Sequence, residues 1–172
     1  PSDFSGGESS ASFRALQRCG FTIVPKKSIA TNSLTNVVNE ILDLQRNYSS
    51  TNTTEMQRRG VLIRDALPEI IQDKFESLEP IFSAANFQLA IEGSDGKGRK
   101  NASPWVRIYD PSMSPSATLG WYVVLHFSRE GNQSFLALGC GATNFKDGSL
   151  IKVPPQELES QVAWARKTLT KG

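Results

Sequence analysis

The stretch NASPWVRIYDPSMSPSATLGWYVVLHF, from Asn101 to Phe127, predicts a strand, a proline-rich loop and a second strand. Residues 103–109 and 121–127 are rich in aromatic and β-branched side chains, which favour extended backbone. The loop between them contains Pro111 and Pro115. Each proline fixes φ and removes an N–H donor, so we expect a stiff loop that leaves small apolar surfaces at a sheet edge.

A glycine-rich, basic loop, GSDGKGRK at residues 93–100, comes just before the first of these strands. Glycines let backbone N–H groups approach a phosphate, while lysine and arginine supply positive charge. The loop lacks the Gly-Lys-Ser/Thr ending of a P-loop, and a flexible solvated turn is an equally good interpretation. A stiff apolar loop beside a flexible cationic one suggests a site for a charged ligand with an apolar feature.

Helical spacing of apolar residues predicts five helices, over residues 33–48, 55–67, 69–75, 78–84 and 157–169. Pro68 is expected to break the chain between the second and third of these helices. The last helix is expected to turn its apolar residues inward, namely Leu158, Val162, Ala165 and Leu169. A further short helix at 13–19 is predicted near the N-terminal end.

The alternating residues 87–92 predict the first strand of the main sheet. A short turn at 129–132 predicts that residues 121–128 and 133–138 pair as a hairpin. A short strand is expected at 21–24, and residues 144–149 are expected to form a loop.

Helices followed by a meander of strands and a last helix indicate an α+β fold with an antiparallel or mixed sheet of about four to five strands. We expect one domain over residues 13–172, preceded by a loose segment at 1–12.

Composition limits the class of protein but does not identify it. The net charge of the 172 residues is +2, so the local distribution of charge matters more than the total. Cys19 and Cys140 are far apart and lack metal-site spacing, which favours two reduced thiols and a cytoplasmic location. The sequence contains no apolar run of about 20 residues, so we expect no membrane span.

The sequence offers no constellation of catalytic residues. His126, the single histidine, lies within a predicted strand and has no nucleophile motif near it, so a structural role is the better interpretation. One histidine and two distant cysteines do not make an ordinary zinc site. We therefore expect a non-catalytic domain with no metal and no cofactor.

Two basic elements point instead to a phosphodiester ligand. One lies on the predicted helix at 55–67 and one in the basic loop, and together they supply six cations: Arg58, Arg59, Arg64, Lys97, Arg99 and Lys100. Ordinary surface charge is the competing interpretation, but two separate elements beside the proline loop favour DNA contact. Trp105, Trp121 and Tyr122 are expected to lie mostly in the core, whereas Tyr109, at a strand end, is the one of these aromatic residues that we expect to be exposed.

Three segments carry a resemblance to a known family: Arg59-Gly60-x-x-Ile63-Arg64-Asp65, Pro104-Trp105-Val106, and Ser114-Pro115-Ser116-Ala117-x-x-Gly120-Trp121-Tyr122-Val123-Val124-x-x-Phe127. Over roughly residues 58–141 the sequence resembles the N-terminal DNA-recognition domains of modification-dependent (type IV) restriction enzymes. These include the McrB-type domain and the related sulfur-binding domain of McrA-like enzymes that carry HNH nuclease domains. The resemblance implies double-stranded DNA and a linked nuclease domain as partners.

The two branches of this family differ in what they read. The McrB-type branch turns a methylated cytosine out of the duplex into an aromatic-lined slot. The sulfur-binding branch recognises phosphorothioate DNA, in which sulfur replaces a non-bridging backbone oxygen. Because sulfur is more polarisable and a poorer hydrogen-bond acceptor, an apolar cavity accepts it and disfavours the hydrated oxygen.

The physics of the proline loop favours the sulfur-binding branch. The resemblance implies a sulfur cavity made by the loop and the adjoining strand end: Tyr109, Met113, Ser114, Pro115 and Ala117, with Pro111 nearby. Met113 and Ser114 stand where that branch carries an aromatic residue before the proline. Methylcytosine reading and a protein-interaction module that does not touch DNA remain the alternative hypotheses.

Overall fold

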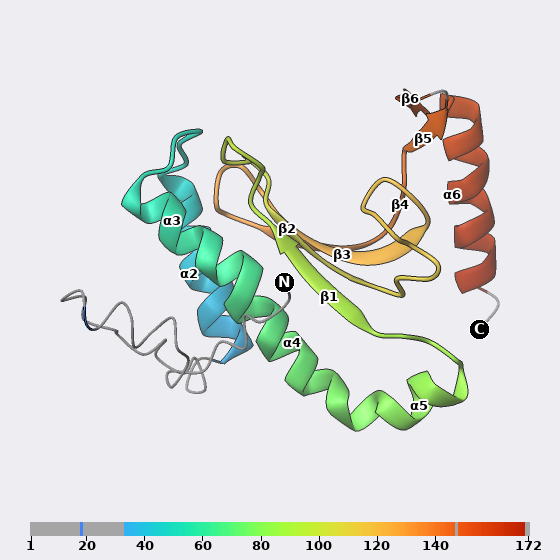
Figure 1. Cartoon of the computed structure of the whole chain (residues 1–172), viewed down its shortest axis with the longest axis horizontal. Helices are drawn as coiled ribbons and strands as arrows, with labels where there is room; N and C mark the ends of the chain where they lie inside the picture. The colour runs from blue at the N-terminus through green and yellow to red at the C-terminus, as the bar shows by residue number, and fades with distance from the viewer. Residues whose placement is uncertain (1–17, 19–32, 147, 171–172) are drawn as a thin grey trace. The chain divides into compact units, whose positions relative to one another are not determined.

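The structure, a computed structural model, describes residue 18, residues 33–146 and residues 148–170 (Figure 1). From Asn32 onward the chain forms one unit. Its helical elements are α2 (Leu34–Arg46), α3 (Thr54–Val61), the π-helical turn η1 (Leu62–Ala66), α4 (Leu67–Phe75), the 3-10 turn η2 (Glu76–Leu78), α5 (Glu79–Ala84) and α6 (Pro155–Leu169). Its strands are β1 (Ala90–Ser94), β2 (Trp105–Tyr109), β3 (Trp121–Phe127), β4 (Ser134–Cys140), β5 (Thr143–Lys146) and β6 (Ser149–Lys152).

Helix α2 begins where the sequence predicts it. The hydroxyl of Ser33 accepts a hydrogen bond from the backbone N–H of Asn36 at 3.2 Å, which satisfies one of the unpaired donors of the first turn. Val37, Ile41 and Gln45, spaced four residues apart, are buried along one face. The helix therefore contributes an apolar stripe that ends in a buried amide.

Helices α3 and α4 form one uninterrupted helical run through the π-helical turn η1, and the predicted break at Pro68 is wrong. The N–H of Leu67 bonds to the carbonyl of Leu62, five residues back, as in a π-helix. Pro68 falls in the first turn of α4, where its missing N–H is tolerated. The wide turn before it also relieves the clash that a proline ring makes with the carbonyl four residues back.

The main sheet has the order β1-β2-β3-β4, and every neighbouring pair is antiparallel. Helix α4 and the η1 turn lie along one face of the sheet, α4 at β1 and η1 at β1 and β2 (Figure 1). Val106 of β2 is fully buried on this side. Because side chains alternate along a strand, Trp105, Arg107 and Tyr109 project from the opposite face. That second face carries the candidate site.

The C-terminal part differs from the sequence expectation in two ways. Residues 144–149 were expected to be a loop, but residues 144–146 belong to β5 and Ser149 begins β6, and these two strands form a second sheet. Helix α6 meets the main sheet at Trp121, whose ring lies 5.8 Å from that of Trp164. Val162 and Leu169, expected to be buried, are 39% and 67% exposed. Helical spacing shows which residues share a face, but it does not show what lies opposite that face.

The α+β prediction and the four-stranded sheet are confirmed. The expected strand at 21–24 and loose segment at 1–12 lie outside the described residues, as do Cys19 and, apart from residue 18, the expected helix at 13–19. Cys140 is a free thiol. Among the described helices, none is long and apolar enough to cross a membrane.

Candidate nucleic-acid interface

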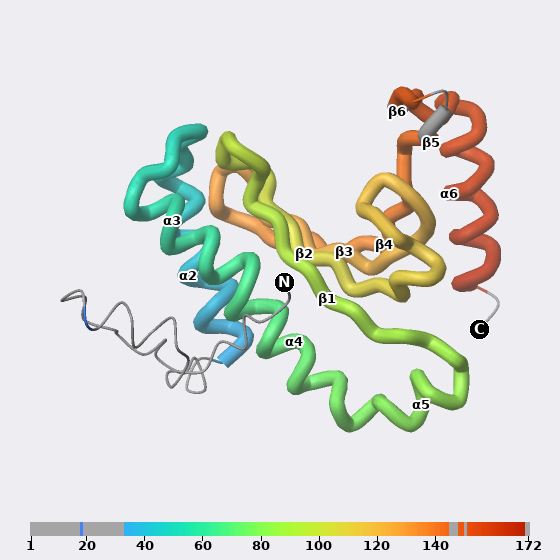
Figure 2. The backbone as a smooth tube through the Cα atoms, in the orientation of Figure 1, coloured from blue at the N-terminus to red at the C-terminus, as the bar shows by residue number. Residues whose placement is uncertain are grey.

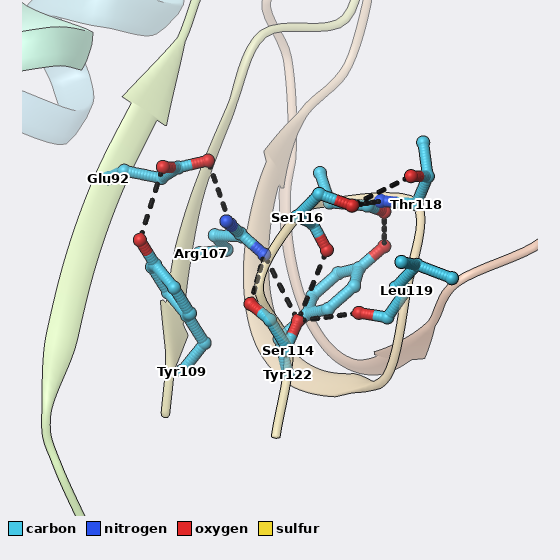
Figure 3. Close-up of polar contacts among 9 residues, drawn as sticks. Glu92, Arg107, Tyr109, Ser114, Ser116, Thr118, Leu119 and Tyr122 are labelled. Carbon is cyan, nitrogen blue, oxygen red and sulfur yellow. Dashed lines mark hydrogen bonds and ion pairs between the residues drawn. The ribbon is translucent and has the colours of Figure 1, made fainter. Parts of the chain in front are cut away.

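Arg107 binds the proline loop to the second face of the sheet, which carries Trp105, Arg107 and Tyr109 (Figure 3). Its side chain is only 2% exposed, and its Nη1 donates to both the backbone oxygen and the hydroxyl of Ser114, at 3.2 and 3.1 Å. On the other side, Nε donates to the carboxylate of Glu92 in β1 at 2.8 Å. The guanidinium lies 3.6 Å from the ring centroid of Tyr109. One side chain thus links β1, β2 and the loop.

The loop is also braced from within. The hydroxyl of Ser114 donates to the carbonyl of Leu119 at 2.8 Å, and the hydroxyl of Tyr122 donates to the carbonyl of Ala117 at 2.9 Å (Figure 3). At Gly120 the backbone is left-handed, with φ of 75°. A side chain there would run into the carbonyl of Met113, so only glycine fits without rearrangement. The prediction of a stiff loop is consistent with these contacts.

Asp110 holds the start of the loop. Its carboxylate accepts hydrogen bonds from the hydroxyl and the backbone N–H of Ser112, at 2.6 and 2.7 Å, and from the N–H of Gln88 at 2.9 Å. These hydrogen bonds lower the pKa of Asp110. The hydroxyl of Ser112 has the largest effect, and the N–H of Gln88 has the next largest. The carboxylate is therefore ionised near neutral pH and ties the loop to the segment that leads into β1.

A small cavity of about 110 Å³ opens between the loop and the sheet. Its lining is one loop residue and four strand residues: Ala117, Trp105, Tyr122, Val124 and His126. This volume exceeds the ~10–15 Å³ that one water needs, and is below the ~300–1,000 Å³ of sites for drug-sized ligands. The cavity therefore suits one small group.

The cavity carries no charge near neutral pH. Burial lowers the pKa of His126 below its usual value and raises that of Tyr122, so both groups are neutral. Arg107, whose guanidinium lies 5.7 Å from the Tyr122 ring centroid, is paired with Glu92 and does not line the cavity. An uncharged, aromatic pocket favours an uncharged aromatic group over an anion.

The residues predicted to form a sulfur cavity occupy four different environments. Met113 is 64% exposed and Pro115 is also exposed, at the outer side of the loop. Ser114 is buried beneath them and engaged with Arg107. Ala117 faces the cavity, while Tyr109 covers the Arg107 guanidinium. The structure thus brings these residues onto one loop and strand end, but not around one common cavity.

Two of the six predicted DNA-contacting cations share a single buried carboxylate. The carboxylate of Asp95 forms an ion pair with Nζ of Lys100 at 2.6 Å and a second ion pair with Arg64. Burial alone raises the pKa of Asp95, but hydrogen bonds from Lys100 and Arg64, and their charges, lower it more, so the net pKa lies below its usual value. Both cations are therefore partly neutralised by the protein itself.

The two arginines on α3 differ from each other. Arg58 is exposed and forms two hydrogen bonds with the carboxylate of Glu40, at 2.7 and 3.1 Å; the side-chain hydrogen bond raises its pKa. Arg59 is 0% exposed, donates to the side chain of Gln45, and donates to the carbonyl of Asn101 at 3.0 Å. Burial lowers the pKa of Arg59. Its contacts give Arg59 a structural role that ties α3 to the end of the basic loop.

Lys97 and Arg99 are exposed, and neither forms an ion pair within the described part of the chain. They lie in a loop whose glycines, Gly96 and Gly98, have positive φ angles of 110° and 79°. Figure 2 shows this loop and the proline loop at opposite ends of β2. The expectation that they lie side by side is wrong: a five-residue strand, about 17 Å long, separates them.

Sequence reasoning missed the central position of Arg107 and of its partner Glu92. The signal was present, because an arginine at the middle of an aromatic strand, Trp-x-Arg-x-Tyr, must share a face with its aromatic neighbours. His126 and Trp105, treated separately in the sequence, line one cavity because they stand opposite each other in the β2–β3 register. Within the described residues, no cluster suited to a metal ion is present.

The family model described as "MrcB-like, N-terminal domain" matches residues 43–172, well over half of the chain. The match includes the whole region of the expected resemblance, 58–141, and extends through α6. No curated protein and no solved structure gives a significant match. The expected resemblance to McrB-type N-terminal domains is confirmed, and the choice between the two branches stays a prediction.

Proposed function

Because the chain belongs to the MrcB-like N-terminal domain family, we propose that it binds duplex DNA and reads a chemical modification that the DNA carries. The proposed role is recognition for a restriction system, with cleavage left to a linked nuclease domain. The observation that carries the proposal is the proline loop, braced against the sheet above an uncharged aromatic cavity. Ordinary phosphate recognition needs neither a rigid apolar loop nor an uncharged cavity, whereas recognition of an altered group benefits from both.

The cavity best fits a modified base turned out of the duplex. A base is planar and uncharged, and Trp105 and Tyr122 offer aromatic surfaces against which it can pack. The neutral imidazole of His126 offers one hydrogen-bond donor and one acceptor for a base edge. A methyl group on the base adds apolar area without changing its charge. We therefore place methylcytosine reading first.

Phosphorothioate reading is the second candidate, favoured by a different observation. Met113 and Pro115 present soft apolar surface to solvent on the outer side of the braced loop. A backbone sulfur resting there avoids the loss of hydration that a phosphate oxygen suffers. A discrimination of about 1–3 kcal/mol, the scale of one unpaired polar group, gives about 5- to 150-fold preference.

Lys97 and Arg99 are the proposed main phosphate contacts, because both are exposed and unpaired within the described residues. Arg58, Arg64 and Lys100 would add to the positive field while their carboxylate partners reduce it. Arg59 is left out of the proposed interface, since its side chain is buried. These contacts supply affinity that does not depend on the modification.

The test is a binding assay with three matched duplexes: unmodified, cytosine-methylated, and carrying one stereodefined phosphorothioate. Ala117→Leu fills the cavity, and Met113→Ala trims the outer side of the loop, so each variant challenges one candidate. Methylcytosine reading predicts preference for the methylated duplex, its loss in Ala117→Leu, and brightening of a fluorescent base analogue at the target. Phosphorothioate reading predicts preference for the sulfur duplex and its loss in Met113→Ala.

Either preference supports the proposed function. Binding at low salt without any preference would leave a plain DNA-binding domain. No binding at low salt to any duplex would favour the protein-interaction alternative over DNA reading.

A further inference from the structure

We propose that Arg107 is a positioning residue for modification reading: it fixes the proline loop relative to the β1–β2 hairpin that carries Lys97 and Arg99. This inference rests on the proposed function. Arg107 would set the preference for modified over unmodified DNA without touching DNA itself.

The guanidinium is a planar group with several N–H donors, so it can donate hydrogen bonds to two elements in different directions at once. Nε donates to Glu92 on β1, and Nη1 donates to Ser114 on the loop (Figure 3). The planar group also stacks on the ring of Tyr109 at 3.6 Å. A lysine ammonium at this position carries the same charge, but it has neither the fork nor the flat face.

The two elements joined by Arg107 are the two that the proposed interface needs. Glu92 lies in the strand that leads directly into the basic loop, whereas Ser114 lies at the centre of the proline loop. Since the two loops sit at opposite ends of β2, the distance from phosphate contacts to reading site depends on how the proline loop folds back on the sheet. Arg107 supplies the side-chain bonds that fix this fold-back from β2.

Burial separates this role from phosphate binding. Arg107 is 2% exposed, while its partner Glu92 is 44% exposed, so the carboxylate is the solvent-facing member of the pair. Direct attraction of DNA to Arg107 is therefore weak. A change at this position is expected to alter preference far more than general affinity.

The experiment uses Arg107→Lys and Ser114→Ala, with Arg99→Gln as the control. Arg107→Lys keeps the charge beside Glu92 and removes the fork. Ser114→Ala removes only the hydroxyl, so it remains informative where Arg107→Lys fails to fold. The readouts are hydrogen exchange of residues 110–120 in the free protein, and the ratio of Kd values for unmodified and modified duplexes.

Residues 110–120 are expected to lose protection from hydrogen exchange in both Arg107→Lys and Ser114→Ala. The preference of these variants for the modified duplex is expected to fall about tenfold, the scale of one charge-assisted hydrogen bond, while affinity for unmodified DNA stays within about twofold. Arg99→Gln is expected to do the reverse, weakening binding to all duplexes and leaving loop exchange and preference unchanged.

Unchanged loop exchange in a folded variant would overturn the positioning role, and so would an unchanged preference. A fall in general affinity equal to that of Arg99→Gln would identify Arg107 as a phosphate contact instead. If the unaltered protein shows no preference for any modification, the proposed function fails, and with it the reading role. Hydrogen exchange would still decide separately whether Arg107 holds the loop.

Discussion

Gly93 in β1 lies directly against the backbone carbonyl of Ile63 in the η1 turn, where a Cβ atom would overlap that oxygen. The contact sets how closely the helical run approaches the sheet. We expect Gly93→Ala to lower the free energy of unfolding by at least about 1–3 kcal/mol, because backbone atoms must move apart. Urea denaturation measures this. Gly98→Ala is the matched control.

The control separates the cost of overlap between the added Cβ and the neighbouring backbone from the cost of an unfavourable backbone conformation. Gly98 has no atom within 4 Å of an added Cβ, so its substitution pays only for a left-handed residue, about 1 kcal/mol. Equal losses in the two variants would contradict the packing argument.

Substitutions at Arg59 and Arg99 are expected to have different effects: the first should lower stability, and the second should lower DNA affinity. Arg59→Met leaves the side-chain oxygen of Gln45 and the carbonyl of Asn101 without their donor in a buried site, and should cost about 3 kcal/mol of stability. Arg99→Gln should change stability by less than about 0.5 kcal/mol. Thermal unfolding and DNA titration of both variants, at a temperature where both are folded, check this.

In the DNA titration, Arg99→Gln should reduce the slope of log K against log salt by about 1. Arg59→Met should leave that slope unchanged. A salt slope altered by Arg59→Met would indicate that the buried arginine contributes to phosphate binding after all.

Asp95 should make stability depend on pH at the acid end. Its folded-state pKa is lowered on balance, because hydrogen bonds from Lys100 and Arg64 and their charges outweigh the effect of burial. The stabilisation is therefore present above the unfolded pKa, about 4, and is lost as pH falls through the lower folded pKa. The difference in unfolding free energy between the unaltered protein and Asp95→Asn should be largest at neutral pH and shrink below about pH 4. A difference that is constant with pH would contradict this assignment.

His126 should titrate below its ordinary pKa of about 6.5, because it is half-buried in the cavity wall. The depressed folded pKa means that its contribution to stability is present above about pH 6.5 and is lost as pH falls through the folded value. As the single histidine of the chain, it gives one unambiguous set of imidazole NMR signals. Methylated DNA that fills the cavity should perturb these signals, whereas the phosphorothioate duplex should not.

Local sequence pattern was sufficient for the elements whose partners are near in the chain. β2, β3 and the hairpin to β4 follow from aromatic and β-branched runs with a short turn. β1 starts three residues later than expected, at Ala90, since the backbone N–H of Gln88 bonds to the side chain of Asp110 instead of to a neighbouring strand. The competing partner lies 22 residues away, so no local pattern reveals it.

The same limit explains what could be predicted of the site. A glycine-rich cationic loop is visible in the sequence, and Lys97 and Arg99 are exposed as such a loop suggests. Arg58 and Arg59 are neighbours and look alike in sequence, yet one is exposed and the other is buried. Partners 14 and 42 residues from Arg59 decide its role, and they come together only in the fold.

The π-helical turn at Leu62–Ala66 is a place where evolution could delete one residue from the helical run without disrupting the fold. A π turn holds one residue more than an α turn, so loss of a single residue there would leave α3 and α4 with their apolar stripes on the same side. Elsewhere in the helical run, the same deletion would rotate one stripe by about 100° away from the core. The α-helical turn thus restored would crowd the ring of Pro68 against the preceding turn. A one-residue deletion in this turn should therefore be tolerated best when Pro68 is replaced along with it.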